Sequence, residues 1–457
     1  MDGCFPVAPH RPAAGTVPAG PDLEGPFMAV INAFVQDAVD RAEPLTVDAA
    51  YAHSCSVALE DSAPGTVGLE IESHLVDLDS VADPVAWARV EAVTPVIRAV
   101  AGRSSVTVEP GGQIELSGPP EPDILTAVTA LRHQSMGVRL ALADARLGLA
   151  FAGADPARPS RRVNPRARYR AMEQHYGATG RAAAGQVMMN STAALQVNLQ
   201  AGPKRKWGER VARAYRLGPT LVAISACSPW LHGRDTGWKS ARQRAWSGLD
   251  VRACGPVPGC VAPDPSGDGA LDPAGAWARY AMAAPVAFVG AGQNVRAVGR
   301  TVSFEQWASG AIRLADRTPT SADLQTHLTT LFPPVRLRGY LEVRYLDMTA
   351  PRWWPAIAAV TATLMDDPVA ADLATEATEP TGQLWTEAAR DGLADPRLAA
   401  SARRCLAIAA ARVPAQLGPA VGDLAELIDS GRSPGDLLAE RASQIGALAA
   451  LREMAHA

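Results

Sequence analysis

Four short segments of the chain alternate polar and apolar residues in a pattern typical of β-strands. They are residues 67–72 (VGLEIE), 109–117 (EPGGQIELS), 194–199 (ALQVNL) and 340–345 (YLEVRY). Because successive side chains of a strand point to opposite faces, each segment would place its acids, amides or arginine on one face and its Leu, Ile and Val on the other. The sequence therefore predicts a sheet with one apolar face and one acidic face.

The overall composition fits a globular protein with small-molecule partners. Of the 457 residues, 47% are apolar, which is ample for a substantial core. The 43 basic and 47 acidic residues nearly cancel to a net charge of -4, so no global field favours nucleic acid or an anionic membrane. The six cysteines are scattered without a CxxC pair, and no signal peptide or membrane span is recognisable. These features predict a reduced, cytoplasmic protein.

The pattern along the chain predicts one large α+β unit. Residues 1–25 are rich in Pro, Ala and Gly, which is typical of a disordered tail. Helical periodicity at about 85–101, 123–147 and 207–227 alternates with the strand segments, whereas 151–190 suggests a loop with one short helix around 169–176. The last hundred residues are Ala/Leu-rich and helical. We therefore predict a single catalytic domain over 26–457, with antiparallel strands and a C-terminal helical layer.

The acids of the strand segments have the chemistry of a metal site. Glu70 and Glu72 would lie about 7 Å apart on one face, at twice the rise per residue. The Pro110-Gly111-Gly112 sequence permits a turn or bulge that brings Glu109 and Glu115 toward a common place. Carboxylate oxygens suit hard divalent cations, which keep water and substrate phosphates as further ligands. A solvent-facing charged strand is the alternative for the first pair.

Residues 340–345 add Glu342 and Arg344 to the same face. Four strands that carry mainly Glu, Gln, Asn and Arg indicate a cradle for metal and phosphate. The alternative is a structural ion pair in which Glu342 and Arg344 neutralise each other. Six further arginines lie between Arg158 and Arg170, either as a mobile loop that neutralises phosphates and carboxylates or as a solvated basic surface. With Tyr169 as their one aromatic neighbour, the pattern disfavours nucleic acid. The eight histidines form no HExxH motif, which argues against a zinc hydrolase.

Taken in order, these segments resemble the plant-type glutamate-cysteine ligases, and more closely their bacterial relatives that supply γ-glutamylcysteine for ergothioneine synthesis. The resemblance covers roughly residues 65–365. Its motifs are Gly68-Leu-Glu70-Ile-Glu72, Glu109-Pro-Gly-Gly-Gln-Ile-Glu115-Leu-Ser117, Arg168-Tyr169-x-x-Met172 with Tyr176, Met188-Met189-x-x-Thr192-x-x-x-Gln196-Val-Asn198, Ser228-Pro229, Ser240-x-Arg242-x-x-x-Trp246, His327-Leu-Thr-Thr-x-Phe332-Pro-x-Val-Arg336, and Tyr340-Leu-Glu342-Val-Arg344.

The resemblance implies a glutamine-synthetase-like fold, in which the concave face of a curved, mainly antiparallel sheet holds ATP, Mg²⁺ and glutamate. It implies ATP-dependent joining of the L-glutamate γ-carboxylate to L-cysteine through γ-glutamyl phosphate, giving γ-glutamylcysteine, ADP and phosphate. Two alternatives remain open. One is a carboxylate-amine ligase that uses another amine, and the other is a non-catalytic relative that binds ATP or glutamate.

The resemblance also implies roles for individual residues. Glu70, Glu115 and Arg344 would be catalytic, and the metal would be bound by Glu70, Glu72, Glu109, Glu115 and Glu342. ATP phosphates would be bound by Arg344 and Arg168, and the glutamate pocket would be formed by Met189, Thr192, Gln196, Arg242 and Trp246, with Arg242 pairing with a carboxylate. A related bacterial class has histidine where this chain has Gln196, so the resemblance implies a substrate contact there rather than a metal contact.

Overall fold

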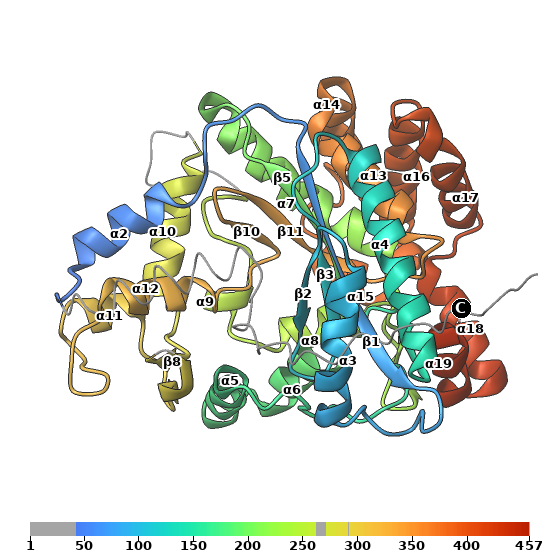
Figure 1. The fold of residues 1–457 in the computed structure, drawn as a ribbon. Helices are drawn as coiled ribbons and strands as arrows, with labels where there is room; N and C mark the ends of the chain where they lie inside the picture. Colours follow the sequence, from blue (N-terminus) through green and yellow to red (C-terminus); the bar gives the residue numbers. More distant parts are fainter. Residues whose placement is uncertain (1–42, 262–270, 291, 457) are drawn as a thin grey trace, which may run out of the picture.

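The computed structural model describes residues 43–261, 271–290 and 292–456 (Figure 1). The predicted tail at 1–25 therefore lies outside the described residues. Within them, no helix is both long and apolar enough to cross a membrane.

An open sheet of seven strands forms the centre of the molecule (Figure 1). Its order is β10 (Val335–Leu337), β11 (Tyr340–Asp347), β5 (Ala194–Gln200), β1 (Val67–Asp77), β3 (Ile114–Ser117) and β2 (Ser105–Val108), and β4 (Leu147–Ala150) pairs with the far end of β1. Every pair in the sheet is antiparallel. The four segments predicted from alternation are all in this sheet, so strands that are far apart in sequence become neighbours.

The strand register brings the predicted polar side chains together. Glu72 lies opposite Glu115, and Glu70 lies opposite Gln196. On the other side of β5, Glu342 lies opposite Asn198. The alternate residues of these strands, such as Leu69, Ile71 and Val197, are fully buried on the other face.

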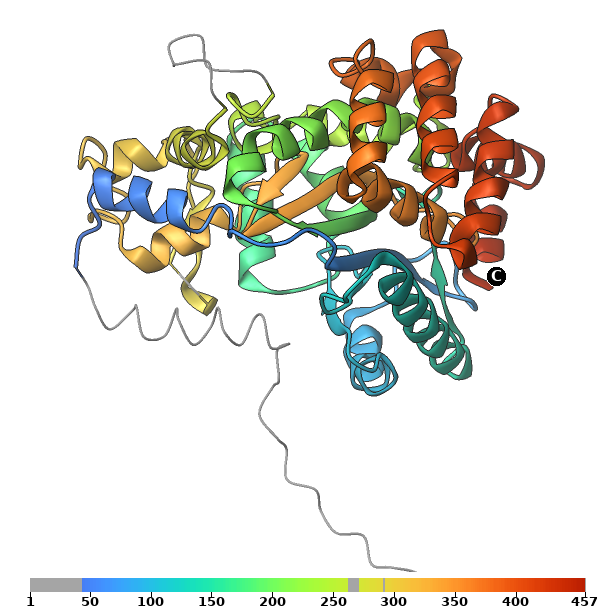
Figure 2. The same cartoon turned by 90° about the horizontal axis from the view of Figure 1, so that it is seen from above.

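Helices cover the apolar face because that face must be removed from water. The helices α4 (Ile124–Asp144), α7 (Trp207–Ser225) and α13 (Trp354–Asp366) contact β1, β11 and β5. Outside them lies the predicted C-terminal layer, which gathers on one side of the molecule in Figure 2. It comprises α14 (Pro368–Ala377), α15 (Trp385–Arg390), α16 (Pro396–Ala410), α17 (Gly418–Asp429), α18 (Pro434–Ile445) and α19 (Ala447–His456).

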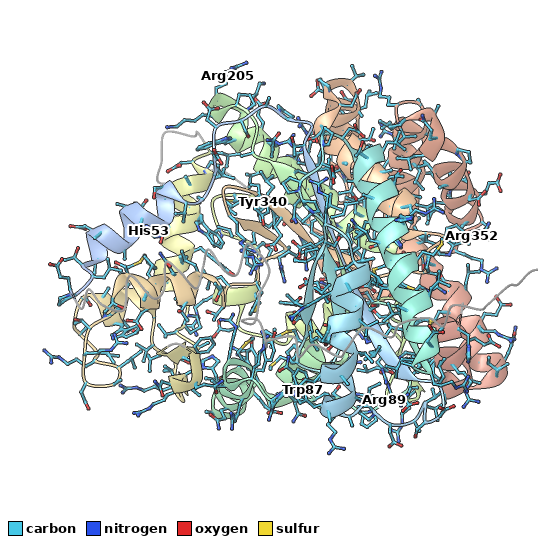
Figure 3. The ribbon with its side chains drawn as sticks, in the orientation of Figure 1. His53, Trp87, Arg89, Arg205, Tyr340 and Arg352 are labelled. Atoms are coloured by element: carbon cyan, nitrogen blue, oxygen red, sulfur yellow. The ribbon has the colours of Figure 1, made fainter. Side chains whose placement is uncertain are left out.

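A second group of helices lies on the opposite side (Figure 2). It consists of α2 (Val47–Ser56), α10 (Pro273–Ala283), α11 (Phe304–Ala308) and α12 (Ser321–Leu328), and its apolar cluster includes Phe304 and Trp307. In the view of Figure 3, Tyr340, at the start of β11, lies between the two groups, whereas Arg205 and Arg352 lie at the outer edge.

The segment 151–190 differs from its prediction. It contains two helices, α5 (Ala167–Ala178) and α6 (Ala182–Ser191), rather than one. A Cβ on Gly185 would lie 2.6 Å from the Tyr176 ring, so α6 is specified by close packing on α5 that its Gly- and Ala-rich sequence does not reveal. Apart from short 3₁₀ helices, the other described elements are α3 (Trp87–Val100), α8 (Ala241–Ser247), α9 (Val251–Cys254) and two small hairpins, β6 (Trp230–Leu231) with β7 (Arg234–Asp235) and β8 (Phe288–Val289) with β9 (Arg296–Ala297).

Candidate active site

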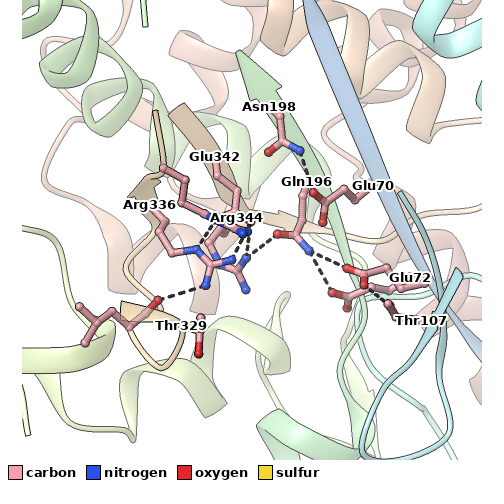
Figure 4. Close-up of polar contacts among 12 residues, drawn as sticks. Glu70, Glu72, Thr107, Gln196, Asn198, Thr329, Arg336, Glu342 and Arg344 are labelled. Atoms are coloured by element: carbon pink, nitrogen blue, oxygen red, sulfur yellow. Dashed lines mark hydrogen bonds and ion pairs between the residues drawn. The ribbon is translucent and has the colours of Figure 1, made fainter. Parts of the chain in front are cut away.

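Three carboxylates from two neighbouring strands meet on the polar face of the sheet (Figure 4). Glu72 accepts hydrogen bonds from the Ala194 amide at 2.7 Å and from Gln196 Nε2 at 3.2 Å. The same Gln196 nitrogen lies 3.4 Å from Glu115 Oε1, and Asn198 Nδ2 donates to Glu70 Oε1 at 2.8 Å. Gln196 of β5 therefore bridges Glu72 of β1 and Glu115 of β3, and Asn198 holds Glu70 separately.

Glu109 approaches these acids through the predicted turn. Its backbone N–H donates to Gln113 O, and the Gly112 N–H donates to Glu109 O, each at 2.9 Å. Gly112 has a φ of +87°, a conformation that favours glycine. A Cβ on Gly111 would lie 2.1 Å from Asn190 O, so the turn packs directly on the end of α6.

Burial and mutual repulsion favour the protonated forms of Glu72, Glu109 and Glu115 in this carboxylate cluster. Both effects raise the pKa of Glu109 to about 7, and they raise the pKa of Glu115 well above its usual range. Burial likewise raises the pKa of Glu72, although Arg242 opposes the shift. A divalent cation bound here would relieve the repulsion by replacing the protons.

The cluster fits a magnesium ion by the chemistry of its donors. All the charged groups are carboxylates, the ligands that hard cations prefer. In the described part of the chain, no group of three or more acid, His or Cys side chains already converges as a metal cage. Mg²⁺ commonly takes one or two protein carboxylates and fills its remaining positions with water and substrate phosphate, so a partial set of this kind suits it.

Glu342 has different surroundings, because arginines surround it. Its side chain is 1% exposed and is hydrogen-bonded by Arg336 through both oxygens, with Arg344 Nη1 at 3.0 Å and Arg338 at 3.7 Å. Burial favours the neutral acid, but the charges of Arg336 and Arg344 outweigh it and lower the pKa. The Glu342–Arg344 ion pair, which was the alternative to a metal site in the sequence analysis, is therefore present. To bind a metal ion, Glu342 would have to give up a contact with an arginine.

Arg344 connects the carboxylate cluster with Glu342 (Figure 4). Its Nη1 donates to Gln196 Oε1 at 2.5 Å as well as to Glu342, while its buried Nε has no partner among the described residues. Gln196 therefore accepts from an arginine at one end and donates to acids at the other, which fixes the orientation of its amide. The unused Nε donor suits an incoming anion.

A second set of unused donors lies at Arg242 and Trp246 on α8. Arg242 is 2% exposed, and its Nη2 donates to Arg344 O at 2.6 Å. Its Nε and Nη1, and the Trp246 Nε1, are buried without a hydrogen-bond partner in the described structure. Buried donors of this kind are costly unless a ligand satisfies them, so the pair is arranged for a carboxylate.

Met189 and Thr192, also predicted for this pocket, lie at the junction of α6 and β5. Met189 belongs to the apolar cluster that includes Trp246. The Thr192 hydroxyl donates to Met188 O at 2.6 Å, and Gln113 Nε2 donates to the carbonyls of Thr192 and Met189 at 2.9 and 3.3 Å. In this structure Thr192 shapes the pocket wall through its backbone and presents no free hydroxyl proton.

The arginine-rich segment contains both ion-paired and solvent-exposed residues. Arg158 forms a buried ion pair with Asp155 at 2.6 Å and Arg162 pairs with Glu173 at 2.9 Å, whereas Arg161, Arg166 and Arg170 are exposed. Arg168 lies nearest the candidate site. It is held by the hydroxyl and carbonyl of Thr329 and lies over the Phe288 ring, and Glu109 contributes to its electrostatic surroundings.

Two polar residues of this region were not predicted as site residues. Arg336 lies opposite Glu342 on β10, and the alternation Val335-Arg336-Leu337 was the signal that could have indicated it. Asp347 lies at the end of β11 beside Arg242 and has no such signal.

An open antiparallel sheet with carboxylates and arginines on one face and helices on the other defines a glutamine-synthetase-like α+β protein, which confirms the predicted fold class. A crystal structure of glutamate-cysteine ligase from Francisella tularensis in complex with AMP has a similar fold, with a TM-score of 0.51 and 13% identity, over 87% of this chain and 88% of that one.

Sequence comparison identifies the family. The model of glutamate-cysteine ligase family 2 matches residues 66–454. The chain is 48% identical over 410 residues to glutamate-cysteine ligase EgtA of Mycolicibacterium smegmatis, covering 90% of this chain and 95% of that protein. It is 47% identical to EgtA of Mycobacterium tuberculosis H37Rv (92% and 96% covered) and 29% identical to the chloroplastic glutamate-cysteine ligase A of Oryza sativa subsp. japonica (74% and 70%). The chain belongs to glutamate-cysteine ligase family 2, as the sequence motifs predicted.

Proposed function

We propose that this protein is an ATP-dependent ligase that joins the γ-carboxylate of L-glutamate to the amine of L-cysteine, giving γ-glutamylcysteine, ADP and phosphate. The observation that carries the proposal is the juxtaposition, on one sheet face, of a buried carboxylate cluster with arginines whose donors are unused. The similarity to two EgtA glutamate-cysteine ligases over nine tenths of the chain supports the same reaction.

The chemistry requires two anions to react. The γ-carboxylate oxygen attacks the terminal phosphorus of ATP, the bond to ADP breaks, and an acyl phosphate forms. The cysteine nitrogen then attacks the acyl carbon, and phosphate leaves. Positive charge placed in advance around both anions lowers these barriers, and Arg344 supplies a permanent cation with an unused donor at the centre of the face.

Each candidate residue has a role in this scheme. Glu70, Glu72, Glu109 and Glu115 would hold Mg²⁺, which when bound neutralises phosphate charge. Glu342 is the fifth candidate and orients Arg336 and Arg344. Arg242 and Trp246 would bind the glutamate α-carboxylate, with Gln196 beside the γ-carboxylate and Met189 and Thr192 forming the wall. Arg168 lies near Glu109 and would add charge toward ATP.

The product would supply ergothioneine synthesis, as the resemblance of the sequence motifs implies, and the chain matches two proteins named EgtA over at least nine tenths of its length. We place the protein in the cytoplasm and expect L-glutamate, L-cysteine and ATP, with Mg²⁺, as its ligands. A panel assay tests the second substrate: ADP release is measured with L-glutamate, ATP and Mg²⁺ and a series of amines. Cysteine should give the highest kcat/KM, and a higher value with another amine would replace cysteine in the proposal.

A further inference from the structure

Asp347 is on the polar face of the sheet because of a bulge in β11. The pairing of β11 with β5 runs from Val343 opposite Val197 to Leu346 opposite Leu195. Over this stretch β11 contains one residue more than β5. An extra residue reverses which face each following side chain joins. Asp347 therefore lies opposite Ala194, on the face that carries Gln196, rather than with the apolar Leu341 and Val343.

The Asp347 carboxylate is enclosed and fully hydrogen-bonded. It is 1% exposed and accepts from the Cys227 amide at 3.0 Å, the Ser228 hydroxyl at 2.6 Å and the Ser240 hydroxyl at 2.9 Å. A Cβ on Gly153 would lie 2.4 Å from Asp347 Cγ, so the carboxylate has no room to move. Burial raises the pKa of Asp347, but the Arg242 charge and the hydrogen bonds from Ser228, Cys227 and Ser240 oppose this shift and favour the charged carboxylate.

The two serines also hold the first turn of α8. Ser240 is the N-cap of α8 and accepts from the Gln243 N–H at 3.1 Å. Ser228 Oγ accepts from the Arg242 N–H at 3.1 Å. Asp347 thus fixes the backbone from which Arg242 extends, as well as compensating its charge.

The distance between the two charges is informative. Arg242 Nη1 lies 3.9 Å from Asp347 Oδ1, close enough for attraction but beyond hydrogen-bond length. Arg242 Nε and Nη1 therefore stay unsatisfied while the guanidinium is held by its Nη2 bond to Arg344 O and by its position 5.7 Å from the Trp246 ring. A direct Arg–Asp fork would have consumed these donors.

We propose that Asp347 is a positioning residue for carboxylate recognition: it orients Arg242 and balances its charge while leaving two donors free for the carboxylate of an amino-acid substrate. The inference rests on the proposed function, in which that substrate is L-glutamate. Asp347 itself touches no substrate. It acts through Arg242 and through the start of α8.

A double-mutant cycle tests this role, with the Kd for L-glutamate measured by calorimetry and the KM for each substrate measured by ADP release. Asp347→Asn should raise the glutamate Kd and KM about tenfold with a smaller change in kcat and in the KM for ATP. In an Arg242→Lys background, Asp347→Asn should add little. Additive effects in the cycle, or a glutamate Kd that stays at the wild-type value, would overturn the proposal.

Two further variants separate positioning from folding. Asp366→Asn breaks another buried Arg–Asp pair, with Arg210, and should lower stability without changing the glutamate Kd. If Asp347→Asn does not fold, Ser228→Ala is measured in its place. This variant keeps the Asp347 carboxylate but removes one of its hydrogen bonds, and it should also weaken glutamate binding. Wild-type protein that binds glutamate through Arg242 but does not form a bond to cysteine would refute the proposed function and leave this inference standing. Wild-type protein that binds no glutamate would overturn the inference.

Discussion

At the scale of single residues, the main electrostatic feature is the division of charge across the sheet face. Glu72 and Glu115 share the Gln196 amide and Glu70 is held by the Asn198 amide, whereas Glu342 is surrounded by arginines. Burial raises the pKa values of Glu72 and Glu115 and so favours their protonated forms, whereas the charges of Arg336 and Arg344 lower the pKa of Glu342 and keep it ionised. Metal binding is therefore expected to begin in the carboxylate cluster and to reach Glu342 only when phosphate engages its arginines.

Glu342→Gln tests how much turnover depends on this ionised carboxylate. The change leaves Arg336 and Arg344 without their buried counter-charge, so the free energy of unfolding should fall by about 3 kcal/mol. Turnover should fall about 100-fold or more, because the arginines lose their orientation toward the phosphates. Urea unfolding and ADP release at saturating Mg²⁺ measure the two effects. Asp366→Asn is the matched control and should lose stability alone; equal turnover in the two variants would reduce Glu342 to a structural role.

The residues that alternation placed on the polar face are the ones that could be predicted. Glu70, Glu72, Gln196, Glu342 and Arg344 share one face in the structure because strand periodicity is a local property. Their partners could not be predicted in the same way. Alternation could have placed Arg336 on a strand face, but its pairing with Glu342 depends on the hairpin, and Asp347 depends on a bulge that reverses the expected alternation.

At the scale of elements, the turn at residues 110–112, between β2 and β3, packs against the end of α6. Gly111 packs on the carbonyl of Asn190 at the end of α6, and Gln113 donates to the carbonyls that follow. Such a contact joins segments about eighty residues apart in sequence. Sequence periodicity indicated the turn, but not the helix against which it packs.

Gly111→Ala should therefore disturb the glutamate pocket as well as stability. Its Cβ would overlap Asn190 O, and overpacking of this kind costs about 1–3 kcal/mol. The displaced end of α6 should raise the KM for glutamate, as measured by ADP release. Gly422→Ala on α17 is the control, because nothing lies within 4 Å of the added Cβ, and it should be neutral or slightly stabilising. An unchanged KM in Gly111→Ala would show that α6 shifts without affecting the pocket.

At the scale of the whole molecule, the C-terminal layer is joined to the strand that carries the acids. Helix α19 packs on β4, and β4 pairs with β1, which holds Glu70 and Glu72. A Cβ on Gly148 of β4 would lie 2.3 Å from Ala455 O, so the two backbones approach closely. We propose that the described residues between 43 and 456 fold as one cooperative domain, in keeping with the single domain that the sequence predicted over 26–457.

Leu451→Ala tests that cooperativity from the end of the chain farthest in sequence from the site. Leu451 is 0% exposed in the cluster with Val76 and Ala150, so its truncation should cost about 3 kcal/mol. In a single cooperative unit, the urea midpoint measured by loss of helical circular dichroism and the midpoint measured by loss of ADP release should shift by the same amount. Leu448→Ala, on the same helix but 45% exposed, should change the free energy of unfolding by no more than about 0.5 kcal/mol and so leave both midpoints nearly unchanged. If Leu451→Ala instead produces an early helical transition while activity keeps its wild-type midpoint, the helical layer unfolds independently of the sheet that binds the substrates.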